Sequence, residues 1–269
     1  MSIRYECAGY CIHEQKPESQ VADTGFISKY KFADGSNYSV ILMIADGVAE
    51  YPKSKVLSVT AAAKAKQVLR NCLIARQGSP IDWVSSAMKT AGNNVYELNQ
   101  VKDDFGNFKV AKKGRTTFDV ALINNHVLYY AHIGDGRIYL IDKNDKLMQL
   151  TKDHVDEHGN LLRFLGRSDE FQFDTGSVPL DDYKMLYMAT DGTYKFVLDN
   201  EIEEIVKGNG FLQPKVFRIF ERVQKPVGAA KELSQKLNIS FESALEELIM
   251  RSDDKTAILV RWGEKKNGN

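Results

Sequence analysis

The sequence lacks an excess of charge of either sign. Its 269 residues include 36 Lys and Arg against 36 Asp and Glu, so the formal net charge is zero at neutral pH. Proteins that bind nucleic acid or membrane surfaces through electrostatic attraction usually carry a basic surface. The charge composition therefore argues against both functions, and we expect neither nucleic acid nor membrane among the partners.

Long hydrophobic runs are also lacking. A membrane-spanning helix needs about eighteen or more consecutive apolar residues, and no such stretch occurs. The first residues show no basic segment followed by an apolar one, so we expect no signal peptide and a cytoplasmic location. The content of 43% hydrophobic and 27% charged residues is typical of a globular protein with a sizeable core.

Cysteine is scarce, and Cys7, Cys11 and Cys72 are the three examples. An odd and small number fits a reducing compartment better than a disulfide framework. Cys7, Cys11 and His13 suggest a soft-metal cluster, but no fourth ligand is evident. Positions on an N-terminal strand that faces a core explain the same residues, and we favour that interpretation.

Apolar patterns predict the order of strands and helices. Residues 38–44 form a short apolar run with β-branched residues, which predicts a buried strand that ends at Asp46-Gly47. Helical spacing predicts one amphipathic helix from Ser54 and a second after Pro80. Further predicted elements are a meander of antiparallel hairpins over 116–150, a polar flap over 155–184, strands at 185–190 and 256–262, and a helix from about Ser240.

No linker, repeat or low-complexity tract divides the chain, so we expect a single domain over 1–269. Its strands are joined by hairpin turns, whereas a parallel sheet would need a helix after each strand. The pattern favours an α+β fold in which antiparallel sheets pack together and are covered by helices.

Aspartates follow or precede several of the predicted strands. Asp46 ends the strand in IADG, Asp191 ends that in ATDG, Asp254 precedes the final strand, and Asp135 occupies the turn in IGDGR. If these strand ends converge, their carboxylates need a cation to neutralise them. Oxygen ligands without His or Cys favour Mg²⁺ or Mn²⁺.

A purely structural interpretation is available for each aspartate. Asp-Gly is a frequent turn dipeptide, and a single example is better explained as a β-turn than as a metal ligand. Turn chemistry does not, however, predict the apolar runs that lead to these carboxylates. The set as a whole therefore favours the metal-binding interpretation.

Six segments together resemble a known family. IADGVAE, GRTTFDVALI, HIGDGRIYLI, LTKDH, LYMATDGTYKF and RSDDKTAILV occur in the order and approximate spacing of motifs in metal-dependent, type-2C Ser/Thr protein phosphatases, and the chain is most similar to their bacterial branch. The resemblance covers residues 9–262. It implies a four-layer sandwich of two antiparallel sheets flanked by pairs of helices, with a dinuclear Mn²⁺ or Mg²⁺ centre at one end.

The resemblance also implies roles for individual residues. Asp46 would bridge two ions, the Gly47 carbonyl would bind one of them, and Asp191 and Asp254 would bind the other. Asp135 and Asp191 match the place where some members hold a third, weaker ion. A water activated between the ions would then hydrolyse phosphoserine or phosphothreonine in proteins. The implied partners are a phosphoprotein substrate and a cognate Ser/Thr kinase, and we expect a monomer.

Two motifs depart from the family pattern. In the preferred alignment, Lys16 stands where the family has a phosphate-binding Arg and Val21 stands where it has an Asp, which would weaken activity. A shifted alignment restores an acid at Asp23 but places Glu18 at the position of the cation. In the final motif, Lys255 replaces the usual Asn, and we expect its side chain to be exposed.

Other residues have both a catalytic and a structural interpretation. His154, in TKDH, is a candidate general acid because of its intermediate pKa, although a histidine after a strand is more often hydrogen-bonded and structural. Arg115 and Arg137 are candidate phosphate contacts, but pairing of Arg137 with a carboxylate is the commoner use.

The sequence supports two functional hypotheses from different classes. The first is an active metal-dependent phosphatase, and the second is a catalytically weak or inactive phosphatase-like binding module, suggested by Lys16, Val21 and Lys255. A third, a glycosidase with two acids, is disfavoured because four ordered aspartates exceed its needs.

Overall fold

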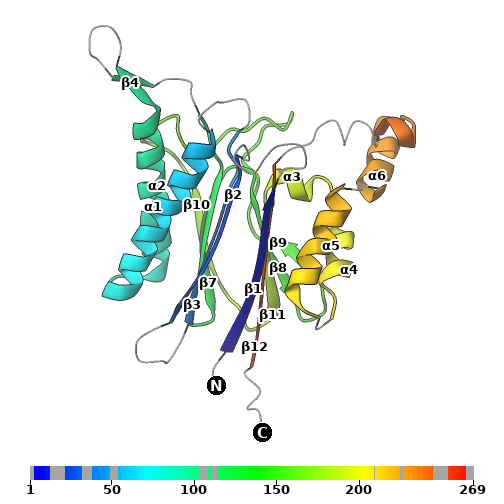
Figure 1. The fold of residues 1–269 in the computed structure, drawn as a ribbon, viewed down its shortest axis with the longest axis horizontal. Helices are drawn as coiled ribbons and strands as arrows, with labels where there is room; N and C mark the ends of the chain where they lie inside the picture. Colours follow the sequence, from blue (N-terminus) through cyan, green and yellow to red (C-terminus); the bar gives the residue numbers. More distant parts are fainter. Residues whose placement is uncertain are drawn as a thin grey trace.

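Two five-stranded antiparallel sheets form the centre of the computed structural model (Figure 1). The first sheet contains, in order, β1 (Ile3–Ile12), β12 (Lys255–Glu264), β11 (Tyr183–Ala189), β8 (Arg137–Asp142) and β9 (Leu147–Gln149). The second contains β10 (Asp174–Pro179), β7 (Val127–Ile133), β6 (Phe118–Asn124), β3 (Tyr38–Ala45) and β2 (Thr24–Lys31). The structure describes residues 3–12, 22–31, 38–48, 54–102, 108–110, 114–208, 210–224, 227–244 and 254–264.

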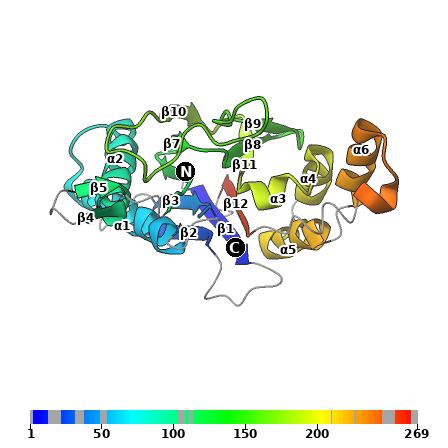
Figure 2. The same cartoon turned by 90° about the horizontal axis from the view of Figure 1, so that it is seen from above.

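Helices cover the outer face of each sheet (Figure 2). On the second sheet lie α1 (Ser54–Ala75) and α2 (Pro80–Asn99), and on the first lie α3 (Asp191–Tyr194), α4 (Asp199–Val206) and α5 (Leu212–Gln224). The remaining elements are α6 (Val227–Leu237) and a hairpin of β4 (Gln100–Lys102) and β5 (Phe108–Val110). The predicted four-layer arrangement of two antiparallel sheets between helices is confirmed. None of the helices in the described ranges is long and apolar enough to cross a membrane.

Alternation along β3 explains why the sequence of this strand is apolar throughout. Ile41 and Met43 belong to the core beneath α1 and α2, whereas Leu42 and Ile44 belong to the core between the two sheets. Since successive residues of a strand point to opposite faces, a strand covered on both faces must be apolar at every position. The strand therefore ends where the core ends, at Asp46.

The predicted helices from Ser54 and Pro80 and the final strand are confirmed. The start of α2 is set locally, because the Ser79 side chain caps the Asp82 amide and Pro80 occupies the first turn. Of the predicted helix after Ser240, the structure describes residues up to Ala244. Lys16 and Val21 lie outside the described residues.

The prediction of one meander over 116–150 is wrong at its centre. β6 and β7 pair with each other in the second sheet, and β8 and β9 pair in the first, but β7 and β8 do not pair. The turn Gly134-Asp135-Gly136 instead carries the chain from one sheet to the other. In the predicted flap, residues 174–179 form β10, an edge strand whose exposed, polar sequence gives no apolar alternation to detect.

A buried lysine closes the C-terminal end of α4. The Lys215 ammonium donates to the carbonyl oxygens of Val206, Lys207 and Gly208 at 2.7, 2.5 and 3.2 Å, and Lys215 is 5% exposed. The last carbonyls of a helix have no partner within the helix, and a cation there satisfies them. The α4–α5 connection therefore depends on this side chain.

We expect Lys215→Met to lower the free energy of unfolding by about 1–3 kcal/mol, because it leaves buried carbonyl groups without a donor. Urea denaturation followed by circular dichroism measures the change. Lys236→Met, at an exposed position of α6, is the control and should change the unfolding free energy little. Equal stabilities of the two variants would contradict this role.

Candidate active site

The predicted site residues lie at strand ends on one side of the sandwich. Asp46 follows β3, Asp191 follows β11, Asp254 precedes β12 and Asp135 lies between β7 and β8. In Figure 1, α3 and the start of β12 lie at the end opposite the two termini. Both sheets therefore contribute acids to the same end of the molecule.

The backbone fixes Asp46 at the end of β3. Its amide donates to Thr117 Oγ1 at 3.1 Å, and its carbonyl accepts from the Thr116 hydroxyl at 2.8 Å and from the Thr117 amide at 2.9 Å. A Cβ on Gly47 would lie 2.6 Å from the Ala22 carbonyl oxygen, so only glycine fits the close approach there. Asp46 is 9% exposed.

Residues 22 and 23 connect three of the predicted ligand positions. The Ala22 carbonyl approaches Gly47, and the Ala22 amide donates to the Asp254 carboxylate. Asp23 Oδ2 accepts from the hydroxyls of Thr190 and Thr256, at 2.8 and 3.0 Å. This segment therefore links the end of β3 with the ends of β11 and β12.

Asp23 is a buried acid that the preferred alignment does not use. It is 5% exposed and directly precedes β2, and its carboxylate bonds to Thr190, the residue before Asp191, and to Thr256 of β12. The preferred alignment, with Lys16 and Val21, covers residues outside the described ranges, so the weaker activity expected from it stays a prediction.

Lys255 also differs from expectation. We predicted an exposed side chain, but Lys255 is 3% exposed. Lys255 is the first residue of β12, and its backbone pairs with Ile12 of β1, so it belongs to the sheet rather than to the preceding loop.

Asp135 and Asp191 form an electrostatically coupled pair. Burial and, after it, the negative charge of Asp191 raise the pKa of Asp135 to about 7, and the nearby Lys195 ammonium opposes this rise. The Tyr194 hydroxyl donates to the Asp135 carbonyl at 2.9 Å, which fixes α3 against the turn. The pair therefore needs positive charge near it if both carboxylates are to be ionised at neutral pH.

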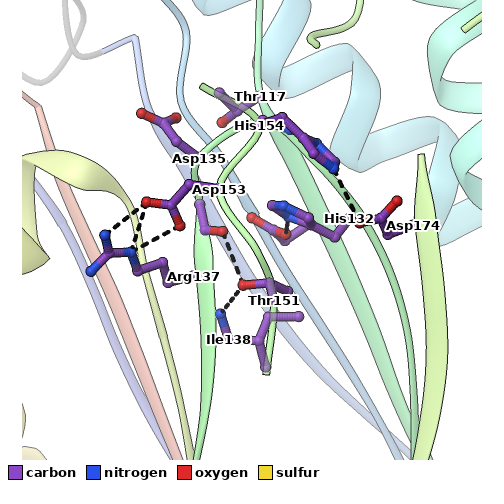
Figure 3. Close-up of polar contacts among 12 residues, drawn as sticks. Thr117, His132, Asp135, Arg137, Ile138, Thr151, Asp153, His154 and Asp174 are labelled. Atoms are coloured by element: carbon purple, nitrogen blue, oxygen red, sulfur yellow. Dashed lines mark hydrogen bonds and ion pairs between the residues drawn. The ribbon is translucent and has the colours of Figure 1, made fainter. Parts of the chain in front are cut away.

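His154 is held in one tautomer. Its Nδ1 accepts from the Gly134 amide at 3.1 Å, so its proton is on Nε2, which lies 3.1 Å from Asp174 Oδ2 (Figure 3). The ring stacks on His132 with centroids 4.6 Å apart. Burial and then the charge of His132 lower the pKa of His154. The structure thus makes His154 a hydrogen-bonded partner of the turn that bears Asp135.

A fully buried pair lies beneath His154. Asp119 Oδ1 is 2.5 Å from His132 Nδ1, His132 Nε2 is 3.0 Å from the Lys152 carbonyl oxygen, and both side chains are 0% exposed. A carboxylate and a carbonyl both accept hydrogen bonds, so His132 donates from both nitrogens as an imidazolium. Burial lowers the pKa of His132, but the charge of Asp119 and its hydrogen bond outweigh that effect and raise it.

The Asp119 carboxylate leaves no room for a side chain at Gly136. A Cβ on Gly136 would lie 2.0 Å from Asp119 Oδ2, a contact that the buried carboxylate has no room to avoid.

Gly136→Ala is therefore expected to lower the free energy of unfolding by about 1–3 kcal/mol. In a protein that already carries Asp119→Ala, Gly136→Ala should lower the free energy of unfolding much less than it does in the wild type. Thermal unfolding of the two single variants and the double variant measures this coupling, and additive effects would contradict it.

The two arginines considered as phosphate contacts have protein partners. Arg137 Nη2 and Nε donate to Asp153 at 2.7 and 3.0 Å (Figure 3). Its guanidinium lies 3.7 Å from the centre of the Tyr194 ring. Arg115 lies over the ring of Phe164 at 4.5 Å. The expected pairing of Arg137 with a carboxylate is confirmed.

The donor chemistry fits a hard divalent cation. Asp46, Asp254 and the Gly47 carbonyl offer oxygen at buried strand ends, and Asp191 is the acid of the adjoining pair. No three His, Cys, Asp or Glu side chains within the described ranges are grouped closely enough to hold an ion as they stand. In this arrangement Asp254 Oδ2 accepts a hydrogen bond from the Ala22 amide.

A family model for protein phosphatase 2C matches residues 28–239. The chain belongs to the protein phosphatase 2C family. It is thus a protein Ser/Thr phosphatase, as predicted, and metal dependence is a property of the family; the alternative of an inactive binding module is not favoured.

Relatives and solved structures agree with this assignment. The phosphatase is 25% identical over 185 residues to protein phosphatase PhpP of Streptococcus pneumoniae, covering 62% of this chain and 72% of that protein. It is 24% identical over 195 residues to serine/threonine phosphatase stp of Listeria monocytogenes, covering 65% and 75%. Its fold is similar to that of Stp1 from Staphylococcus aureus, with a TM-score of 0.72, 17% identity and coverage of 98% and 97%.

Proposed function

We propose that this phosphatase hydrolyses phosphoserine and phosphothreonine in proteins with a two-ion centre at the Asp46 end of the sandwich. In this proposal Asp46 would be the ligand shared by the ions, the Gly47 carbonyl would hold one ion, and Asp191 and Asp254 would hold the other. The single observation that supports it best is the segment Ala22–Asp23, which contacts the positions of Gly47, Asp254 and Thr190, the residue before Asp191.

The residues of the chain have distinct tasks in this proposal. When bound, Mn²⁺ or Mg²⁺ ions supply the positive charge that acidifies a water and neutralises the phosphoryl oxygens. Asp46 and Asp191, which we propose as the catalytic aspartates, fix the ions relative to the phosphorus. Their placement at the ends of core strands keeps this geometry rigid, because β3 and β11 are buried. No side chain acts as the nucleophile.

Two further residues are proposed to act on the substrate. Lys16 binds the phosphate group as a point charge. His154 would donate a proton to the leaving seryl or threonyl oxygen as an imidazolium, a form in which its Nδ1 gives up the hydrogen bond that it now accepts from the Gly134 amide. Since burial lowers the pKa of His154, its contribution as a general acid should increase as the pH falls.

We propose a cellular setting that follows from the relatives. The substrates are phosphoproteins, a Ser/Thr kinase supplies them, and the phosphatase acts as a cytoplasmic monomer whose residues 1–269 form one catalytic domain. The names of PhpP and stp, a protein phosphatase and a serine/threonine phosphatase, support the phosphoprotein substrates.

Hydrolysis of p-nitrophenyl phosphate and of a phosphothreonine peptide tests the proposed function. We expect turnover with Mn²⁺ or Mg²⁺, loss of turnover on chelation, and loss in Asp191→Asn. Circular dichroism confirms that each sample is folded. If the folded protein hydrolyses neither substrate with any divalent ion, the proposal is wrong, and hydrolysis unaffected by chelator would equally contradict it.

A further inference from the structure

A lysine lies between the two coupled carboxylates. Lys195 Nζ is 2.6 Å from Asp191 Oδ2 and 4.0 Å from Asp135 Oδ2. The Asp135 and Asp191 side chains are 7% and 13% exposed, whereas that of Lys195 is 53% exposed. The ammonium therefore approaches a largely buried pair of acids from the solvent side.

The backbone of α3 determines this placement. Asp191 and Lys195 are four residues apart, and the Lys195 amide donates to the Asp191 carbonyl at 3.0 Å, so the two side chains lie on the same side of one helical turn. The Tyr194 hydroxyl ties this turn to the Asp135 carbonyl. The distance from Lys195 to either acid is thus limited by short, local connections.

Arg137, a cation on β8, is already engaged. Arg137 donates to Asp153 through both Nε and Nη2 and lies against the Tyr194 ring. Among the ion pairs of the described residues, Lys195 alone joins Asp135 and Asp191. Its positive charge opposes the rise in the pKa of Asp135 that burial and Asp191 cause. Lys195 thus does electrostatically what a bound cation would do at this pair.

The arrangement leaves Asp191 able to bind an ion elsewhere. Lys195 contacts Oδ2, while Oδ1 accepts a hydrogen bond from the Gly192 amide at 2.8 Å. A carboxylate has about four lone-pair sites, so the Oδ1 side retains capacity for a ligand bond. A tethered ammonium also acts at an effective concentration of roughly millimolar, which suffices against a weakly held ion.

We propose that Lys195 is a built-in cation that occupies the space between Asp135 and Asp191 and prevents a third divalent ion from binding there. The proposal rests on the proposed two-ion function, because it fixes the number of ions at two. Lys195 is a residue that determines ion number, and it need not touch the substrate.

Native mass spectrometry with Mn²⁺ titration, supported by calorimetry, tests this proposal without any activity measurement. We expect two ions in the wild type and in Lys195→Arg, and three in Lys195→Ala. Removing a positive charge that lies 2.6 Å from Asp191 and 4.0 Å from Asp135 should raise the affinity for the third ion by about tenfold or more. Lys184→Ala removes a similar lysine–aspartate pair, with Asp145, and should still bind two ions.

The outcomes separate the two proposals. Two ions in both the wild type and Lys195→Ala would overturn the role of Lys195 and leave the two-ion function intact. No ion in any variant would overturn both. Lys195→Ala should remain folded, because an ion pair whose lysine is half exposed contributes little to the free energy of unfolding. Its thermal unfolding should therefore match that of the wild type.

Discussion

Asp46→Asn is expected to abolish hydrolysis of p-nitrophenyl phosphate, with a fall in kcat/KM of about a thousandfold or more. The amide has nearly the same shape but lacks the charge needed to hold two cations together. The backbone bonds of Asp46 to Thr116 and Thr117 do not involve the carboxylate, so the strand end should keep its structure. Steady-state kinetics at saturating Mn²⁺ measures the effect.

A control variant shows whether the effect comes from losing an ion ligand or merely from losing one carboxylate. Asp181 is 81% exposed at its side chain, and Asp181→Asn should leave kcat/KM unchanged. Circular dichroism and thermal unfolding should show both variants folded. An Asp46→Asn variant with more than about a tenth of the wild-type activity would contradict the bridging role, because a shared ligand cannot be lost at so small a cost.

Asp119→Asn is expected to destabilise the protein by about 3–5 kcal/mol at pH 6, because it leaves the buried His132 imidazolium without its counter-charge. Urea denaturation gives the free energy of unfolding. The exposed His126–Asp181 pair, at 4.0 Å, is the natural comparison, and Asp181→Asn should cost less than about 1 kcal/mol. Equal stability of Asp119→Asn and the wild type would contradict an ionic pair.

The cost of Asp119→Asn should also depend on pH. The folded-state pKa of His132 is raised above its ordinary value of 6.5, so the stabilisation is fully present below about pH 6.5 and is lost as the pH rises through the folded-state pKa. The difference between wild type and variant should therefore shrink in alkaline solution. A difference that grows with pH would contradict a raised folded-state pKa of His132.

Much of the fold could be predicted because its strands and helices carry strong local signals. The apolar run before Asp46 forms β3, and helical spacing after Ser54 and Pro80 forms α1 and α2. The sheet membership of β7 and β8 could not be predicted, since Gly134-Asp135-Gly136 suits a hairpin as well as a crossing between sheets. Packing of the two sheets decides between these alternatives.

Candidate site residues could be predicted from the sequence where an acid directly follows a strand. Residues whose position depends on contacts between distant parts of the chain could not. Asp23 lies in a polar segment with two alignments, and its bonds to Thr190 and Thr256 connect distant parts of the chain. Asp119 and His132 had a usable signal, because the hairpin register of β6 and β7 places them directly opposite each other. Lys195 was not recognised because Asp135 comes from another element.

Anomalous diffraction from a crystal grown with Mn²⁺ tests the central claim most directly. The two-ion centre predicts two manganese peaks that share the Asp46 carboxylate, one of them beside the Gly47 carbonyl and the other beside Asp191 and Asp254. A well-ordered crystal with no manganese peak at Asp46 would contradict the account.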